Sequence, residues 1–140
     1  MRKTLVILNP ASRRGHAAEY WPEVEAELRA AGVEFDLART HQSLHAVQLA
    51  WEAPNEGYEQ VVAMGGDGLV HEVINGLLRA SGESETLPLG IIPFGNGNDF
   101  IKMIPPPCAV GENHDDWRAA IRRIAGEATT FYDVGRIAGD

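Results

Sequence analysis

Short apolar runs alternate with helical segments along almost the whole chain, and this alternation constrains the fold more than any other feature. Runs of strand type lie at residues 4–8, 33–39, 60–64, 87–93 and 129–137. Segments with apolar residues at helical spacing lie at residues 15–31, 43–53, 69–80 and 115–126. Strands and helices that alternate in this way predict a parallel sheet with helices on both faces. The sequence therefore predicts an α/β fold of three layers, doubly wound around a mostly parallel sheet.

The first two predicted helices contain residues that fix their ends and faces. Gly32 closes the first helix at the position where glycine is expected. Pro22 indicates either that this helix begins near Trp21 or that it is kinked at the proline. Ser43 is a candidate N-cap of the second helix. We expect the apolar face of that second helix to consist of Leu44, Val47, Ala50 and Trp51.

The charge balance excludes some classes of partner. The 12 Lys and Arg residues against 20 Asp and Glu residues give a net charge of −8. Such a chain is repelled by the bulk charge of nucleic acids and anionic membranes, so we expect no nucleic-acid partner. Residues 1–15 are the exception, because they contain four basic residues and no acid. The 140 residues are consistent with one domain, and any bound phosphate must be held locally.

The cysteine content and the hydropathy predict a cytoplasmic location. Cys108 is the single cysteine and has no partner for an internal disulfide. The apolar run at residues 4–8 is too short for a signal peptide and ends at Asn9 and Pro10 without a cleavage site. No apolar run reaches the roughly 18 residues of a transmembrane helix, so we expect none.

Three loops share one placement, each after a predicted strand and before a predicted helix. They are residues 9–15, 65–68 and 95–99. The carboxyl ends of parallel strands meet at one edge of a sheet, where ligands bind. Helix N-termini at that edge present N–H groups to an anion, and glycine allows close approach and positive φ angles. Turn geometry alone would explain one glycine loop, but two of them with a basic third favour an anion site.

The acid inside the second loop indicates the kind of site. The Gly-Lys-Ser/Thr ending of a phosphate loop is missing, and neither glycine loop has the spacing of the usual dinucleotide fingerprint. A carboxylate is tolerated beside phosphate when a divalent cation or a transferable proton lies between them. Asp67 therefore predicts magnesium coordination or general-base catalysis. The structural alternative is that Asp67 caps the following helix.

Several motifs together resemble one known family. Residues 65–77, GGDGLVHEVINGL, resemble the signature of the diacylglycerol kinase catalytic domain, which sphingosine and ceramide kinases share. Asn9-Pro10-x-Ser12 resembles the nucleotide loop of this family, and Thr40 with His45-Ala46 resembles its second element. Residues 93–100 resemble its Gly-Thr-x-Asn-Asp-Phe loop, and residues 133–136 resemble the start of the segment that leads to its second domain. The resemblance covers almost the whole chain.

The resemblance implies an ATP-dependent lipid kinase that uses Mg²⁺ and phosphorylates a lipid hydroxyl, such as that of diacylglycerol or a sphingoid lipid. It implies a fold similar to the nucleotide domain of NAD kinases and phosphofructokinases. Residues 1–140 would then be the ATP-binding domain, without the β-rich second domain. Asp67 would be the base for the acceptor hydroxyl or a magnesium ligand. The nucleotide-contacting residues that it implies are Asn9, Pro10, Ala11, Ser12, Arg13, Thr40, Gly65, Gly66, Asp67, Gly68, Leu69, Val70, His71, Glu72, Gly95, Asn96 and Gly97.

Some roles and alternatives stay open. Glu72 would support metal or polar contacts near the phosphates, or would be a first-turn acid favoured by the helix dipole. Arg13, Leu69 and Asn96 depart from the family pattern, which has glycine and two threonines there, and this lowers the expected ATP affinity. The alternatives are an NAD kinase-like enzyme, because Gly-Gly-Asp-Gly occurs there too, and a non-catalytic nucleotide-binding module. We expect a cytoplasmic protein with peripheral contact at the inner face of the membrane, and leave a homodimer open.

Overall fold

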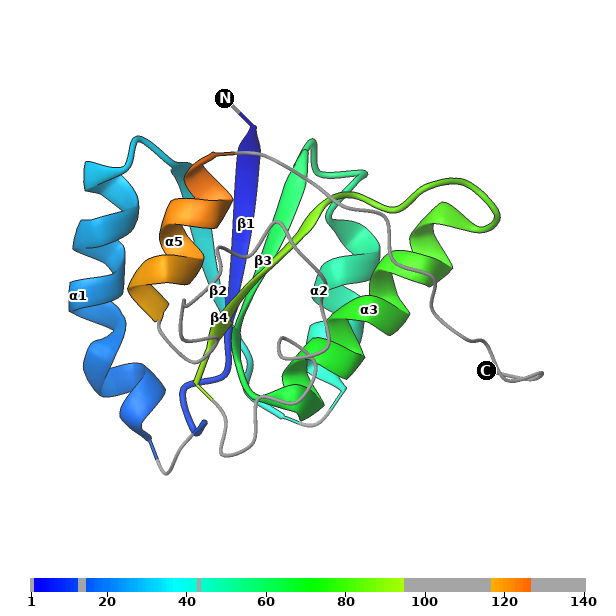
Figure 1. Ribbon diagram of the computed structural model, residues 1–140. Helices are drawn as coiled ribbons and strands as arrows, with labels where there is room; N and C mark the ends of the chain where they lie inside the picture. The colour runs from blue at the N-terminus through cyan, green and yellow to red at the C-terminus, as the bar shows by residue number, and fades with distance from the viewer. Residues whose placement is uncertain (1, 13–14, 43, 95–116, 127–140) are drawn as a thin grey trace.

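The computed structural model describes residues 2–12, 15–42, 44–94 and 117–126, and its centre is a four-stranded sheet (Figure 1). The strands are β1 (Lys3–Leu8), β2 (Glu34–Arg39), β3 (Gln60–Gly65) and β4 (Leu89–Pro93). They lie in the order β2-β1-β3-β4, and every neighbouring pair is parallel. The predicted parallel sheet is confirmed. The strand predicted at residues 129–137 lies outside the described residues.

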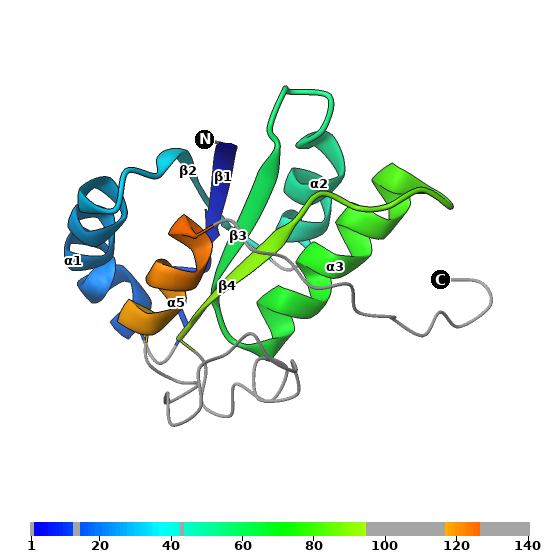
Figure 2. The ribbon, with the colours of Figure 1, turned by 45° about the horizontal axis from the view of Figure 1, so that its top comes forward.

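Helices cover both faces of the sheet. Helices α1 (His16–Ala30) and α5 (Trp117–Ala125) lie on one face, and α2 (His45–Glu52) and α3 (Asp67–Ser81) lie on the other (Figures 1 and 2). Each pair of helices encloses its own apolar core against the sheet. These three layers confirm the α/β, doubly wound class. None of the helices in the described part of the chain has the length and apolarity needed to cross a membrane.

Helix α1 contains Pro22, and its start differs from one of the two expectations. The helix begins at His16, and the N–H of Glu19 already donates to the carbonyl of Gly15 at 3.2 Å. The prediction that it begins near Trp21 is therefore wrong, because a complete turn forms before the proline.

The end of α1 agrees with the prediction from Gly32. Gly32 has a φ of +81°, a conformation that glycine adopts without a steric penalty. Its N–H donates to the Arg29 carbonyl at 3.0 Å, and the N–H of Val33 donates to the Leu28 carbonyl at 3.0 Å. This pair of bonds is a Schellman motif, which ends the helix and turns the chain toward β2.

The predicted apolar face of α2 is wrong at two positions. Leu44 is 66% exposed and Trp51 is 54% exposed. A Cβ atom added to Gly76 of α3 would meet the Val47 carbonyl oxygen and would lie 2.7 Å from Ala50 Cβ, so the two helices are in close backbone contact. Small side chains allow this approach and large ones would prevent it. The buried residues on this side are accordingly Ala46, Ala50 and Ala53.

The N-cap position of α2 is Leu44. Ser43, which the sequence predicted as the cap, lies outside the described residues. Leu44 has a φ of +67°, the left-handed region that disfavours residues with a Cβ atom. Leu44 itself provides no side-chain cap, and its conformation places local backbone strain at the start of the helix.

Candidate functional site

The candidate site lies where the connections from two adjacent strands part to opposite faces of the sheet. β1 continues through α1 on one face, while its neighbour β3 continues through α3 on the other (Figure 1). A crevice at such a switch point is where open α/β sheets bind ligands. The loops after the two strands touch there, because the N–H of Asn9 donates to the Met64 carbonyl at 3.2 Å. The predicted meeting of these two loops at one edge is confirmed.

Asn9 folds the loop after β1 back on itself. Its side-chain Oδ1 accepts the N–H of Ala11 at 3.1 Å, and its carbonyl accepts the N–H of Ser12 at 3.1 Å. Pro10 is half-buried between them. This turn places Ser12 against β3, where a Cβ atom on Gly65 would lie 3.0 Å from Ser12 Oγ. The fifth residue predicted in this loop, Arg13, lies outside the described residues.

The glycines at the end of β3 and just after it have different roles. Gly65 allows close contact with neighbouring side chains, and Gly68 has open space beside it. Gly65 is buried, and a Cβ atom there would lie 2.7 Å from Leu69 Cδ2. Gly66 is extended, with a φ of −99°, and neither Gly65 nor Gly68 has a positive φ. Of the two properties expected of the loop glycines, close approach is found at Gly65 here, and positive φ is found at Gly15 of the first loop, with a φ of +89°. A Cβ atom on Gly68 would meet nothing within 4 Å, so the surface beside the helix N-terminus is open.

Asp67 is the first residue of α3. The N-cap position is Gly66, so Asp67 lies one residue inside the helix. The N–H of Val70 donates to the Gly66 carbonyl at 3.1 Å, and the N–H groups of residues 67–69 precede this first bond of the helix. Such N–H groups have no acceptor within the helix and bind anions well. Asp67 is half-buried, whereas the side chains of Leu69 and Val70 lie in the core.

Glu72 supplies a second carboxylate on α3. It lies beyond the first turn, whose acid is Asp67, so the first-turn alternative for Glu72 is wrong. Its Oε1 is buried and has no hydrogen-bond partner among the described residues. Buried polar atoms usually have partners, so an unpaired carboxylate oxygen near a candidate site indicates a missing cation or donor. His71, which directly precedes Glu72 on α3, is exposed.

The donor type of Asp67 is suited to a magnesium ion that also binds phosphate. Within the part of the chain that the structure describes, no three His, Cys, Asp or Glu side chains are grouped to hold a metal. Mg²⁺ usually binds one or two protein carboxylates and completes its shell with phosphate oxygens and water. Asp67 can supply one such carboxylate, whereas Glu72, five residues later on α3, lies about 140° round the helix from it.

Thr40 reaches the same edge from β2. Its N–H donates to the Leu8 carbonyl at 2.9 Å, and its Oγ1 donates to the same oxygen at 3.5 Å. The next residue, His41, donates its N–H to Nδ1 of His45 at 3.1 Å, and the two rings stack with centroids 5.5 Å apart. The sequence interpretation named Thr40 but missed His41. The spacing of two histidines four residues apart at a helix start is the signal that could have found it.

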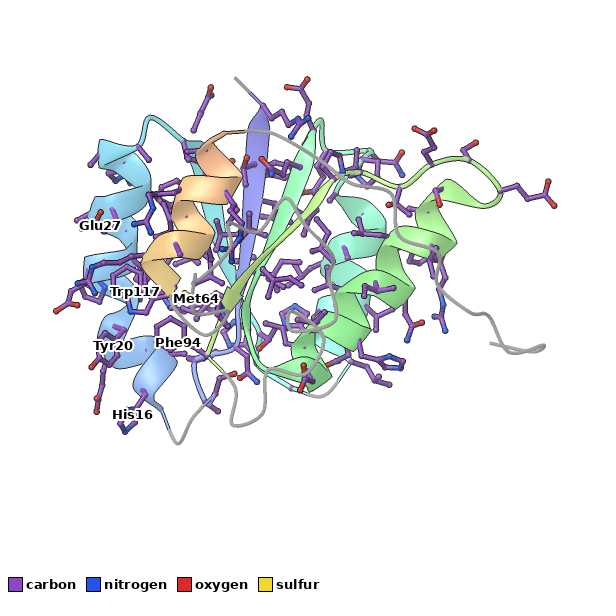
Figure 3. All side chains as sticks on the ribbon, viewed as in Figure 1. His16, Tyr20, Glu27, Met64, Phe94 and Trp117 are labelled. Atoms are coloured by element: carbon purple, nitrogen blue, oxygen red, sulfur yellow. The ribbon has the colours of Figure 1, made fainter. Side chains whose placement is uncertain are left out.

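The third loop starts beside the second. The N–H of Phe94, directly after β4, donates to the Gly65 carbonyl at 2.8 Å. Phe94 is buried between α1 and α5, with its ring centroid 5.7 Å from that of Tyr20 and 6.4 Å from that of Trp117 (Figure 3). This aromatic cluster fixes the point where the loop leaves the sheet. The predicted nucleotide residues of the loop itself, Gly95, Asn96 and Gly97, lie outside the described residues.

Comparison with known proteins identifies one family. The model of the diacylglycerol kinase catalytic domain matches residues 3–137. A diacylglycerol kinase of Bacillus subtilis is 31% identical over 139 residues, which are 99% of this chain and 43% of the relative. Sphingosine kinase 1 of Arabidopsis thaliana is 32% identical over 139 residues, which are 97% of this chain and 28% of the relative.

A solved structure gives the same result for the fold. The crystal structure of a diacylglycerol kinase from Bacillus anthracis is similar, with a TM-score of 0.69 and 27% sequence identity. The match covers 91% of this chain and 43% of that one. The chain thus spans less than half the length of each of these three proteins.

Proposed function

This chain belongs to the diacylglycerol kinase catalytic domain family, a family of lipid kinases, and on that premise we propose that it binds ATP with Mg²⁺ at the β1/β3 edge. In the whole kinase, the bound nucleotide would give its γ-phosphoryl group to a lipid hydroxyl. For the 140-residue chain by itself, we propose ATP binding with little or no transfer, because it spans less than half of its relatives.

The observation that carries the proposal is the contact between the loops after β1 and β3. The Asn9 turn and Gly65 bring Ser12, Asp67 and the N-terminus of α3 to one place. Phosphoryl transfer needs mainly positioning of the reactants and stabilisation of charge on the phosphate oxygens. The N–H groups of residues 67–69, beside the open surface at Gly68, are suited to hold a phosphate.

Asp67 is the residue that we propose as the base. A half-buried carboxylate on the first turn of α3 lies beside the proposed phosphate position. It would accept the proton of the lipid hydroxyl while the hydroxyl oxygen bonds to phosphorus and the bond from phosphorus to the ADP oxygen breaks. In its alternative role, Asp67 would hold Mg²⁺, which would neutralise charge on the phosphate oxygens.

The acceptor and the location belong to the same proposal. Relatives named for diacylglycerol and for sphingosine both match this chain, so we propose a lipid with a free hydroxyl as acceptor. Such a substrate requires at least peripheral contact with a membrane, and we propose the inner face, reached from the cytoplasm. The basic residues of the N-terminal segment, which include Arg2 and Lys3, provide the local charge for this contact.

The test measures binding and transfer separately. Isothermal titration calorimetry of the 140-residue chain with ATP–Mg²⁺ is expected to show binding at one site. Transfer of labelled γ-phosphate is then measured in parallel with diacylglycerol, sphingosine and NAD, with this chain and with a longer active relative as the positive control. Transfer to NAD instead of a lipid would favour the NAD kinase-like alternative. Failure to bind ATP at any Mg²⁺ concentration would overturn the proposal.

A further inference from the structure

Helix α2 has two apolar faces, and the fold buries only one of them. The buried face consists of three alanines, Ala46, Ala50 and Ala53. It packs beside α3, where Gly76 approaches the α2 backbone (Figure 1). The other face consists of Leu44, Val47 and Trp51, and we call it the α2 seam. Their spacing of three and then four residues places all three along one side of the helix.

The α2 seam is left open by the single chain. Leu44 is 66% exposed and Trp51 is 54% exposed, and Val47 between them is half-buried. The other two tryptophans, Trp21 and Trp117, are only 6% and 9% exposed. Leucine is also an unfavourable residue at the φ of +67° that Leu44 adopts. Single exposed apolar residues need no explanation, but large ones aligned along one helix indicate an interaction surface.

The charges of α2 are reversed relative to its helix dipole. The helix has no acid in its first turn and no base in its last turn. Glu52 is its last residue, and the exposed Glu56 follows four residues later. Carboxylates are unfavourable at the negative, C-terminal end of a helix. His41 and His45, whose rings can donate a hydrogen bond to a carboxylate, lie at the opposite end. The two ends of α2 are therefore complementary to each other.

We propose that the α2 seam is the contact between two copies of this chain, whose α2 helices pack antiparallel about a two-fold axis near residues 47 and 48. Leu44 of each copy then lies opposite Trp51 of the other, and Val47 lies near the axis. His45 and Glu52 share one flank of the helix because they are seven positions apart, so His45 of each copy lies near Glu52 of the other. Each acidic end also meets an N-terminal helix end. Such an interface is self-complementary and closes as a dimer.

A second copy fits this face better than a membrane does. Helix α2 contains no lysine or arginine, and its carboxylate would be repelled by anionic lipids. A second copy supplies both an apolar surface and the opposite end of a dipole. One eight-residue helix offers less than the roughly 800 Å² per partner of a stable interface, so we expect a weak, reversible dimer with a Kd of about 10 µM to 1 mM. This inference does not depend on nucleotide binding.

The first experiment is sedimentation equilibrium of the 140-residue chain from about 10 µM to about 1 mM, across the expected Kd. Salt at about 0.15 M, with a Debye length of about 8 Å, screens the repulsion between two chains of net charge −8. The wild type is expected to shift from monomer to dimer. Leu44→Ala and Trp51→Ala should each weaken the dimer by about tenfold or more, as the loss of an interface anchor does. Circular dichroism confirms that both variants are folded.

Tyr20→Ala is the matched control, because Tyr20 is a 40% exposed aromatic residue on α1, which covers the other face of the sheet. It should dimerise like the wild type. A wild type that is monomeric at the highest concentration would overturn the proposal. Dimerisation of Leu44→Ala and Trp51→Ala with wild-type affinity would overturn it too, as would an equal loss in Tyr20→Ala.

Cysteine cross-linking tests the antiparallel register in a Cys108→Ser background. Gln48→Cys lies beside the proposed axis and should give a disulfide-linked dimer under mild oxidation. Leu44→Cys should not, because the two copies of this residue would be about 10 Å apart along the helices, beyond the reach of a disulfide. Ala26→Cys, exposed on α1, is the control for random collision. Cross-linking of Leu44→Cys without Gln48→Cys, or of all three variants equally, would overturn the proposed pairing.

Discussion

Gly65 faces Ser12 across the edge of the sheet so closely that a Cβ atom on Gly65 would lie 3.0 Å from the Ser12 hydroxyl oxygen. We expect Gly65→Ala to shift the loop after β1 and to push the end of the Leu69 side chain, which would lie 2.7 Å away, into the core. The free energy of unfolding should fall by about 1–2 kcal/mol, a typical cost of overpacking. ATP affinity should fall as well, and calorimetry with chemical denaturation measures both.

The double variant Ser12→Ala, Gly65→Ala provides the control for that prediction. It removes the hydroxyl that the new methyl group meets but leaves the contact with Leu69. We expect ATP affinity to recover toward that of Ser12→Ala alone, while the loss of stability remains. Equal ATP affinity of the two Gly65→Ala proteins would show that Ser12 does not transmit the effect.

Two glycines of α3 should respond in opposite ways to the same substitution. Gly76→Ala places a methyl group against the Val47 carbonyl and 2.7 Å from Ala50 Cβ, so α2 and α3 must separate. It should lower the free energy of unfolding by about 1–3 kcal/mol. Gly68→Ala is the matched control, because nothing lies within 4 Å of its Cβ atom. The higher helix propensity of alanine should stabilise it by up to about 1 kcal/mol. Urea denaturation of both proteins tests the contrast, which similar midpoints would contradict.

Asp67→Asn tests the proposed base in an active, longer form of the kinase. The amide has nearly the same shape but cannot accept the hydroxyl proton, so turnover should fall by about 10²–10⁴-fold, the usual contribution of a general base. Initial rates of lipid phosphorylation measure this, and circular dichroism confirms that the fold is retained. Turnover within a factor of about two of the wild type would remove Asp67 from this role.

Leu44→Gly should stabilise the protein. Leu44 has a φ of +67° and is 66% exposed, so its side chain loses little burial while its backbone is strained. Glycine relieves a strain of roughly 1–2 kcal/mol but adds entropy to the unfolded chain. The net gain should be about 0.5 kcal/mol in thermal or urea denaturation. Leu44→Ala, which keeps the strain, is the control and should show no gain.

Tyr58 should make stability depend on pH in alkaline solution. Its hydroxyl donates to Asp36 Oδ2 at 2.8 Å. Partial burial, this hydrogen bond and the negative charges of Asp36 and Glu56 raise the pKa of Tyr58 from 10.0 to about 12. Because the folded pKa lies above the unfolded one, the stabilisation is complete below pH 10.0 and is lost as the pH rises to about 12.

Tyr58→Phe isolates that contribution. The variant lacks the ionisable hydroxyl, so its stability should change less than that of the wild type over the same alkaline range. Denaturant midpoints along the pH series give the comparison, and the ultraviolet absorbance of tyrosinate locates the titration. If both proteins lose stability in parallel, Tyr58 does not have the predicted effect.

The strands were predictable because a strand that is buried on both faces is a continuous run of apolar residues in the sequence. Residues 61–64 of β3 are four consecutive apolar residues, all fully buried, as expected for a parallel strand between two helix layers. The buried face of α2 could not be identified from its sequence pattern in the same way. Its large residues, Leu44 and Trp51, face outward because Gly76 of α3 approaches the backbone of α2. Which face of α2 is buried therefore depends on α3, and the periodicity of the α2 sequence carries no information about α3.

The position of some candidate site residues was predictable from the sequence, but their contacts were not. The placement of Asp67 between a strand and a helix follows from the local sequence, and the structure has it on the first turn of α3. The approach of Ser12 to Gly65 joins two loops far apart in the chain, and the bond from His41 to His45 depends on the left-handed Leu44 between them. Such contacts depend on backbone geometry that residue types alone do not specify.

The central position of β1 affects how the chain is synthesised. β1 is made before β2 and β3, and it pairs with β2 on one side and with β3 on the other. The buried hydrogen bond from the Thr4 hydroxyl to Gln60 Oε1 spans 56 residues. Until those residues have left the ribosome, one edge of an apolar strand stays unpaired and open to aggregation. The nascent chain is therefore expected to need protection by chaperones until β3 emerges, and to fold slowly for its size.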